Sequence, residues 1–467
     1  MKQRFLFTRR QAVQCLCTSA GYLTMAHALR RFGLMNAYAQ DVSDYKALVC
    51  VFLFGGNDGN NTIVPMDTNG FSAYDAVRGG SPINLPQSSL LPVETRSGAL
   101  YGFHSSMPEV QSLFAQEKLA VLANVGPLLR PTNRAQYLNQ SVPIPANLFS
   151  HSDQQNQWQT SAPNSLSVVG WGGKIADVMQ GANGSSQYPL LVSTAGSVVF
   201  GSGVTTNPVN LVAQPPWVSQ PGVACLPGPS VFRIEDCGLR TNAMQQLLAF
   251  DTNARLIQSA SDTMRKAFSY SAILNQARAG APSLDWPLSS GLGDQLRTVA
   301  EIIQVRSALG AKRQIFFVSL GGFDTHFTQG ATTGVQADLL RELSRALSVF
   351  QQAISDLGTT SAVTTFTLSD FGRALQPNTS LGSDHAWGNH QFILGGAVQG
   401  REMFGQFPTL ALGGPNDASS NGRWIPTTSI DQYGATLARW FGVPDAQLPA
   451  IFPHLTNFSV PNLGFLG

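Results

Sequence analysis

Aspartate occurs in four short turns of the 467-residue chain, and two of these turns also contain histidine. Carboxylates and neutral imidazoles in one cluster suit Zn²⁺ or Mn²⁺, whereas clusters dominated by carboxylates suit Ca²⁺. The turns therefore predict a site for a divalent metal. Its candidate ligands are Asp58, Asp324, His326, Asp370, Asp384, His385 and His390. Each Asp could instead shape its turn, and each His could simply be hydrogen-bonded.

Ser150 and His151 are candidate catalytic residues, and Ser152, on the other side of His151, is an alternative nucleophile. If a helix begins here, the free backbone amides of its first turn favour an anionic group. A serine beside a metal could attack a phosphoryl or sulfuryl centre, and the alternative is an ordinary helix-capping serine. Arg373 follows Asp370 by three residues. It could clamp an anionic substrate or form a structural salt bridge with that carboxylate.

The expected elements place these turns at one edge of a sheet. Continuous apolar runs, typical of strands buried on both faces, span residues 46–54, 119–125, 314–320 and 363–368, with a weaker run at 188–200. Helical patterns alternate with them at residues 107–116, 173–180, 242–278, 292–309 and 335–357. This alternation predicts an α/β fold with a doubly wound, mostly parallel sheet and helices on both faces. Ligands of such sheets bind beyond the carboxyl ends of the strands, where three of the turns lie.

The first 39 residues have the pattern of an export signal. They contain six basic and no acidic residues, and Arg9 and Arg10 precede a short apolar stretch that leads to a small-residue pattern ending at Ala39. This predicts recognition by the twin-arginine translocase and cleavage after Ala39, with an uncleaved membrane anchor as the alternative. The stretch is shorter than the roughly 20 apolar residues of a membrane span. We therefore expect a periplasmic or secreted protein without a stable span.

Residues 40–467 are expected to form a single domain with a Gly- and Pro-rich insertion at about 183–237. They contain 23 basic and 27 acidic residues and no basic run, which disfavours nucleic-acid binding. Cys50 lies within an apolar run and should be a buried thiol. Cys225 and Cys237 flank a Pro/Gly loop and could form a disulfide in an oxidising compartment.

Taken together, the motifs resemble those of the domain of unknown function 1501 family, which comprises exported bacterial proteins distantly similar to sulfatases and alkaline phosphatases. The resemblance rests on residues 54–65, 150–158, 321–326, 369–373, 383–390, 395–400 and 431–442. It implies an alkaline-phosphatase-like fold, two divalent metal ions and a nucleophile at a helix start. By chain order, one ion would be held by Asp58, Asp370 and Asp384 or His385, and the other by Asp324, His326 and His390. The chain lacks the Cys/Ser-x-Pro-x-Arg pattern that sulfatases convert to formylglycine, so the usual sulfatase mechanism is not expected.

The sequence thus favours an exported metal-dependent hydrolase of phosphate or sulfate esters, with an anionic small molecule or a glycan ester as its substrate. The alternative is a catalytically degenerate protein of the cell envelope that binds a metal or another ligand. A redox protein is less favoured, because the chain has neither a nucleotide-binding glycine pattern nor the cysteine cluster of a haem or iron–sulfur site.

Overall fold

The computed structural model describes residues 44–211, 243–244, 246–249, 254–279 and 281–467. The predicted export signal and the cysteine pair Cys225 and Cys237 lie outside these residues. None of the helices in the described ranges is long and apolar enough to cross a membrane. Cys50 is fully buried as a free thiol, which confirms its prediction.

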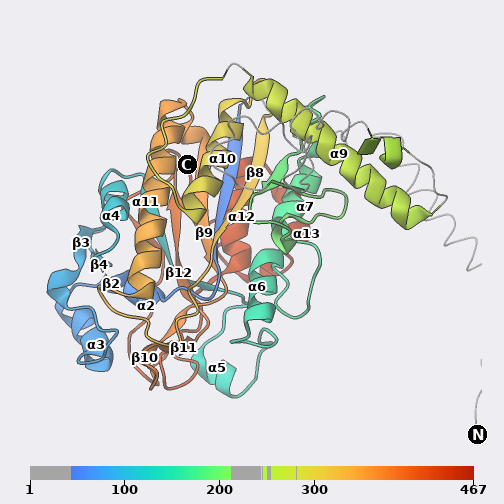
Figure 1. The fold of residues 1–467 in the computed structure, drawn as a ribbon. Coiled ribbons are helices and arrows are strands. Elements are labelled where there is room, and N and C mark those ends of the chain that lie inside the picture. Colours follow the sequence, from blue (N-terminus) through green and yellow to red (C-terminus); the bar gives the residue numbers. More distant parts are fainter. Residues whose placement is uncertain (1–43, 212–242, 245, 250–253, 280) are drawn as a thin grey trace, which may run out of the picture. The chain divides into compact units, whose positions relative to one another are not determined.

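A largely parallel sheet forms the centre of the fold (Figure 1). Its strand order is β13-β5-β12-β9-β1-β8-β6-β7, and β14 also pairs with β5. The central strand β1 pairs in parallel with β8 on one side and with β9 on the other. Strand β12 runs antiparallel to both β9 and β5. The strands span Lys46–Leu53 (β1), Leu119–Gly126 (β5), Leu191–Ser193 (β6), Val209–Asn210 (β7), Arg313–Leu320 (β8), Val363–Ser369 (β9), Asn389–Leu394 (β12), Met403–Gly405 (β13) and Thr428–Ser429 (β14).

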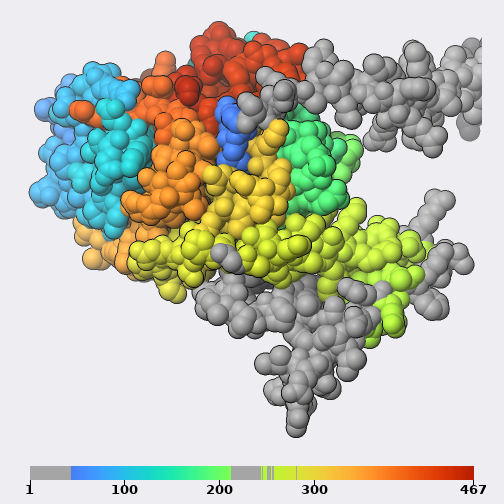
Figure 2. Space-filling model, turned by 90° about the horizontal axis from the view of Figure 1, so that it is seen from above, coloured from blue at the N-terminus to red at the C-terminus, as the bar shows by residue number. Residues whose placement is uncertain are grey.

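Helices cover both faces of this sheet, because successive side chains of a strand point to opposite faces. On β1, Val49 and Val51 belong to one buried cluster, whereas Cys50 and Phe52 belong to another. The first cluster includes residues of α4 (Pro108–Ala115), α9 (Arg255–Arg278), α10 (Gly291–Gln304) and α11 (Val335–Asp356). The second includes residues of α6 (His151–Thr160), α7 (Trp171–Val178), α12 (Ile430–Phe441) and α13 (Leu448–Ile451). Figure 2 shows α9 running along the side of the molecule that α10 and α11 cover.

The remaining elements surround the carboxyl end of the sheet. Strands β10 and β11 pair antiparallel, and β2, β4 and β3 form a small sheet in that order. These elements are α2 (Gly59–Thr62), β2 (Ile63–Pro65), α3 (Thr68–Arg78), β3 (Leu91–Glu94), β4 (Leu100–Phe103), α5 (Arg134–Leu138), β10 (Arg373–Pro377) and β11 (Ser383–His385).

The prediction of a mixed α/β fold with a largely parallel sheet is confirmed, and its four strong strands correspond to β1, β5, β8 and β9. The weak run at 188–200 forms only the short strand β6. Both β6 and β7 lie within the expected insertion, yet they extend the edge of the central sheet. Residues 212–237 of that insertion lie outside the described ranges.

The strand register brings the predicted turns together. Leu53, the last residue of β1, is level with Leu320 at the end of β8 and with Ser369 at the end of β9. The three segments that follow therefore leave the sheet at one edge, close to β10 and β11 (Figure 1).

Candidate functional site

Three imidazoles converge on one carboxylate oxygen at this edge. The Nε2 atoms of His151 and His326 each lie 3.4 Å from Oδ1 of Asp324, and Nε2 of His385 lies 3.5 Å from it. The Nε2 atoms of His326 and His385 are 2.7 Å apart. Here these four side chains are named the His/Asp cluster. They come from α6, from the turn after β8 and from β11.

Two of the imidazoles are oriented by an acceptor at Nδ1, and the third has a carboxylate nearby. His151 Nδ1 lies 2.7 Å from Asp370 Oδ2, and His385 Nδ1 lies 2.7 Å from the carbonyl oxygen of Phe149. His326 Nδ1 lies 3.4 Å from Asp384 Oδ1. Because carbonyl and carboxylate oxygens only accept, they favour a proton on Nδ1 of His151 and of His385 and leave the Nε2 atoms of these two rings as acceptors. The 2.7 Å hydrogen bond between His326 and His385 then has Nε2 of His326 as its donor.

The local charges favour an ionised carboxylate in the cluster. Partial burial raises the pKa of Asp324. The hydrogen bond and the positive charge of Arg373 outweigh this effect, so the pKa falls from 3.8 to about 2. The hydrogen bond to Asp370 raises the pKa of His151, whereas burial lowers the pKa of His385.

The cluster fits a divalent cation. His151, Asp324 and His385 offer three ligand atoms that all lie within 4.8 Å of one another. Zn–N bonds of about 2.0–2.1 Å in a tetrahedral site separate ligand atoms by about 3.3 Å, close to the 3.4 and 3.5 Å from Asp324 Oδ1 to the imidazoles. Nε2 of His151 is also buried without a hydrogen-bond partner. A buried acceptor of this kind is the group that a metal would satisfy.

Two predicted ligands lie behind the histidines. Asp370 is fully buried, and its Oδ2 accepts from His151 Nδ1 and from Gln155 Nε2, both at 2.7 Å. Asp384 faces His326 and accepts from Asn378 Nδ2 at 3.0 Å. Carboxylates behind metal-binding imidazoles commonly fix the ring orientation and raise ligand basicity. We therefore assign both residues an orienting role in the proposals for this site. Asp370 also remains a candidate ligand, because its Oδ1 is buried without a hydrogen-bond partner.

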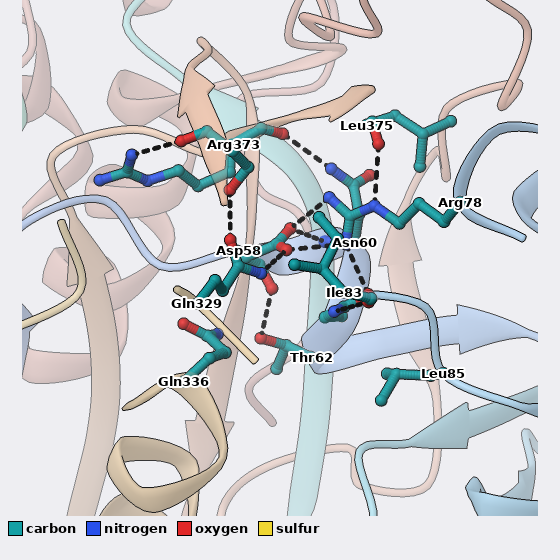
Figure 3. Close-up of polar contacts among 12 residues, drawn as sticks. Asp58, Asn60, Thr62, Arg78, Ile83, Leu85, Gln329, Gln336, Arg373 and Leu375 are labelled. Carbon is teal, nitrogen blue, oxygen red and sulfur yellow. Dashed lines mark hydrogen bonds and ion pairs between the residues drawn. The ribbon is translucent and has the colours of Figure 1, made fainter. Parts of the chain in front are cut away.

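Asp58 is engaged in a separate buried network (Figure 3). Its two carboxylate oxygens accept from the Arg78 guanidinium at 2.7 and 3.1 Å, and both side chains are completely buried. The backbone amide of Asn60 and Nε2 of Gln329 also donate to this carboxylate, at 3.1 and 2.6 Å. With these donors in place, Asp58 is left out of the proposed ligand set.

His390 lies on β12, in an apolar setting. Its ring stacks on Phe407 with centroids 4.6 Å apart, and its Nδ1 accepts from the backbone amide of Asn124. Burial lowers the pKa of His390 to about 4. The structure does not bring His390 into the His/Asp cluster, so it too is left out of the proposed ligand set.

The guanidinium of Arg373 is directed inward. It donates to the carbonyl oxygens of Gly55, Gly56, Phe323 and Ser383 and to Oδ1 of Asp324. The residue is 1% exposed. It therefore ties together the loops after β1 and β8 and strand β11. It forms a salt bridge with Asp324, whereas the predicted alternative was a salt bridge with Asp370, and each of its three guanidinium nitrogens donates to the protein.

A helix does begin at the predicted nucleophile. Ser150 is the N-cap residue of α6, and His151 is the first residue of that helix. The Ser150 side chain makes no capping bond; its hydroxyl donates to Asp153 Oδ2 at 2.6 Å and lies 3.2 Å from the hydroxyl of Ser152. This hydrogen bond is the largest cause of a lowered pKa at Asp153.

Sequence reasoning missed several partners of the cluster. Gln155 lies one helical turn after His151, so its contact with Asp370 follows from the i,i+4 spacing once the helix is recognised. The contact of the Phe149 carbonyl with His385 has no such signal, and neither does the contact of Arg78 with Asp58 in the separate network. Nothing in the local sequence pattern shows which distant group either residue contacts.

One family matches part of the chain. The family described as "Protein of unknown function (DUF1501)" matches residues 232–422. The match bears out the sequence resemblance over this part, which contains Asp324, His326 and His385 but not Ser150 or His151. No curated protein matches the chain at a significant level.

Solved structures match at low identity. The structure of Ps i-CgsB in complex with k-i-k-neocarrahexaose is 9% identical, with a TM-score of 0.33, over 88% of this chain and 77% of the other. The PsFucS1 sulfatase from Pseudoalteromonas sp. is 11% identical, with a TM-score of 0.33, over 90% and 72%. The Zn complex of the C-terminal periplasmic domain of EcEptC from Escherichia coli is 10% identical, with a TM-score of 0.28, over 76% and 74%.

Proposed function

We propose that the protein is a metal-dependent hydrolase of phosphate or sulfate esters that acts outside the cytoplasm. The observation that carries this proposal is the convergence of three imidazole Nε2 atoms on Asp324 Oδ1 at the carboxyl end of the sheet. His151, Asp324 and His385 would hold the metal. His326 lies beside them, with its Nε2 2.7 Å from that of His385, and would contact the cluster from one side. Export through the predicted twin-arginine signal is part of the proposal.

The bound cation would supply positive charge that polarises an ester oxygen and offsets negative charge in the transition state. The protein's part is to hold the ligands in place beforehand. Asp370 holds the Nδ1 proton of His151, and the Phe149 carbonyl holds that of His385. Arg373 keeps Asp324 ionised and fixes its position through a 2.6 Å hydrogen bond. Such preorganisation avoids reordering the site during the reaction.

Ser150 is the proposed nucleophile. It immediately precedes His151, whose ring lies in the cluster, and its hydroxyl proton is directed at the Asp153 carboxylate. The backbone N–H groups of the first turn of α6 lack intrahelical acceptors and carry partial positive charge, which favours an anionic ester at this position. This combination supports a phosphoryl or sulfuryl group as the reacting centre.

The test combines metal content with ester hydrolysis. Protein purified from the extracytoplasmic fraction should contain one to two equivalents of Zn, Mn or Ca and hydrolyse p-nitrophenyl phosphate or p-nitrophenyl sulfate. Asp324→Asn should lower metal affinity by more than about 100-fold. Substituting a residue that only hydrogen-bonds to a metal ligand costs about 10–100-fold, and losing a ligand itself should cost more. Asp338→Asn is the matched control, since Asp338 is an exposed carboxylate paired with Arg341. A wild-type protein that stays metal-free after reconstitution would refute the proposal.

One observation favours metal binding without turnover as the second candidate. Arg373 is 1% exposed, and each of its three guanidinium nitrogens donates to the protein, so it is not free to clamp a substrate, which was one of its two predicted roles. A catalytically degenerate metal- or ligand-binding protein of the cell envelope would bind metal with the same residues and hydrolyse none of the esters.

A further inference from the structure

We infer that Gln329 is a positioning residue for the His/Asp cluster. Its side-chain amide joins the two chain segments that carry Asp324, His326 and His385, and the buried Asp58–Arg78 pair fixes the orientation of that amide (Figure 3). The inference rests on the proposed function to the extent that the cluster binds a metal. It assigns a purpose to the network around Asp58, which the proposed reaction does not use.

The amide oxygen of Gln329 connects the two ligand segments. It accepts from the hydroxyl of Thr325 at 3.2 Å and from that of Ser383 at 2.5 Å. Thr325 is the residue between Asp324 and His326, and Ser383 opens β11, which ends at His385. Gln329 and these two hydroxyl residues are at most 2% exposed. One buried oxygen therefore sets the spacing between both sides of the cluster.

The orientation of this amide is fixed from behind. Nε2 of Gln329 donates to Asp58 Oδ2 at 2.6 Å, and the same oxygen accepts from Arg78 at 2.7 Å. A carboxylate in an ion pair can only accept hydrogen bonds, so the NH₂ group must face Asp58. The amide oxygen must then face the two hydroxyls. A flipped amide would place two oxygen acceptors against each other in a buried setting, which is costly.

Backbone bonds hold the same loops independently of this side chain. The amide of Gln329 donates to the carbonyl of Leu381 at 3.0 Å, and that of Ser383 donates to the carbonyl of Thr325 at 3.2 Å. Replacing the Gln329 side chain should therefore loosen the ligand segments without separating them. Changes behind metal ligands typically cost 10–100-fold in metal affinity. Because Gln329 acts through neighbours of the ligands, we expect about a tenfold loss.

The experiment measures the Zn²⁺ dissociation constant of the full chain by competition with a chelator. Gln329→Met keeps the approximate volume but removes the amide, and should weaken Zn²⁺ binding about tenfold. Gln336→Met is the matched control. Gln336 is equally buried in the same network, where its Nε2 donates to Asn57 Oδ1 at 2.8 Å, but the structure gives it no bond to Thr325 or Ser383. Its affinity should equal that of wild type.

A charge exchange separates positioning from general packing. Gln329→Glu places a second carboxylate against Asp58 and should weaken Zn²⁺ binding more than Gln329→Met does. Adding Asp58→Asn restores a donor–acceptor pair with position 329 and the original net charge. Because the same Asp58 oxygen also accepts from Arg78, the new amide nitrogen would face that donor, so the double variant should recover part of the lost affinity. A thermal melt would show whether Gln329→Met is folded. If it is not, the comparison of the double variant with Gln329→Glu still tests whether Gln329 positions the cluster.

Three results would overturn the inference: unchanged Zn²⁺ affinity in folded Gln329→Met, an equal loss in Gln336→Met, or a double variant no better than Gln329→Glu. A wild-type protein that binds none of Zn²⁺, Mn²⁺ and Ca²⁺ would overturn both the inference and the proposed function. One that binds Zn²⁺ but hydrolyses no ester would overturn the proposed function alone, because the readout here is metal affinity.

Discussion

Removing Arg78 should destabilise the fold more than removing any exposed arginine. Its guanidinium makes five hydrogen bonds: two to Asp58, one to Asn61 and two to the carbonyl oxygens of Ala374 and Leu375. Arg78→Met would leave a completely buried carboxylate with only the donors from Gln329 and Asn60, and would leave two buried carbonyls without this partner.

The expected cost follows from that burial. Breaking a buried ion pair by removing one partner costs about 3–5 kcal/mol. With an unfolding entropy of about 2.1 cal/mol/K per residue over roughly 420 residues, this corresponds to a fall in Tm of about 3–6 °C. The double change Arg78→Met with Asp58→Asn should recover part of the loss, because it removes the uncompensated charge.

The assay is urea and thermal unfolding of chelator-treated protein, since bound metal would itself raise the apparent stability. Arg341→Met is the control: Arg341 pairs with Asp338 at the surface, where such pairs contribute about 0–1 kcal/mol. An Arg78→Met protein within about 1 kcal/mol of the control, or a double variant less stable than the single one, would refute the reasoning.

Two further predictions concern protonation. Asp370→Asn should lower the pKa of His151, which the hydrogen bond to this carboxylate raises, and should weaken Zn²⁺ binding about 10–100-fold; an unmoved His151 titration by NMR in metal-free protein would contradict it. Burial raises the pKa of Asp431 from 3.8 to about 6, so the folded state holds this proton more tightly than the unfolded chain. Protonated Asp431 therefore contributes most to stability below about pH 4. As the pH rises to about 6 this contribution is lost, and the free energy of unfolding falls by about 3 kcal/mol. Asp431→Asn should abolish this slope in denaturation measured across that range, and a retained slope would assign it to other groups.

The sequence by itself predicted four strands of the central sheet and the edge of the sheet at which the turns after three of them meet. Continuous apolar runs predicted β1, β5, β8 and β9, because a strand buried on both faces needs apolar side chains in both directions. Since parallel strands end at one edge, the polar turns after β1, β8 and β9 had to meet there. The run at 188–200 was less informative, and only three of its residues form a strand.

Tertiary structure alone decided which polar groups face one another. Asp58 and Asp370 both follow strands, yet Arg78 engages the first and His151 the second. Apolar periodicity is a local property and can be read along the chain. A buried carboxylate instead interacts with whichever donor packing brings within about 3 Å, and Asp370 and His151 are 219 residues apart in sequence. For this reason the sequence indicated the types of residue in the cluster. Only the fold shows that the three histidines face Asp324 and that Asp370 supports one of them from behind.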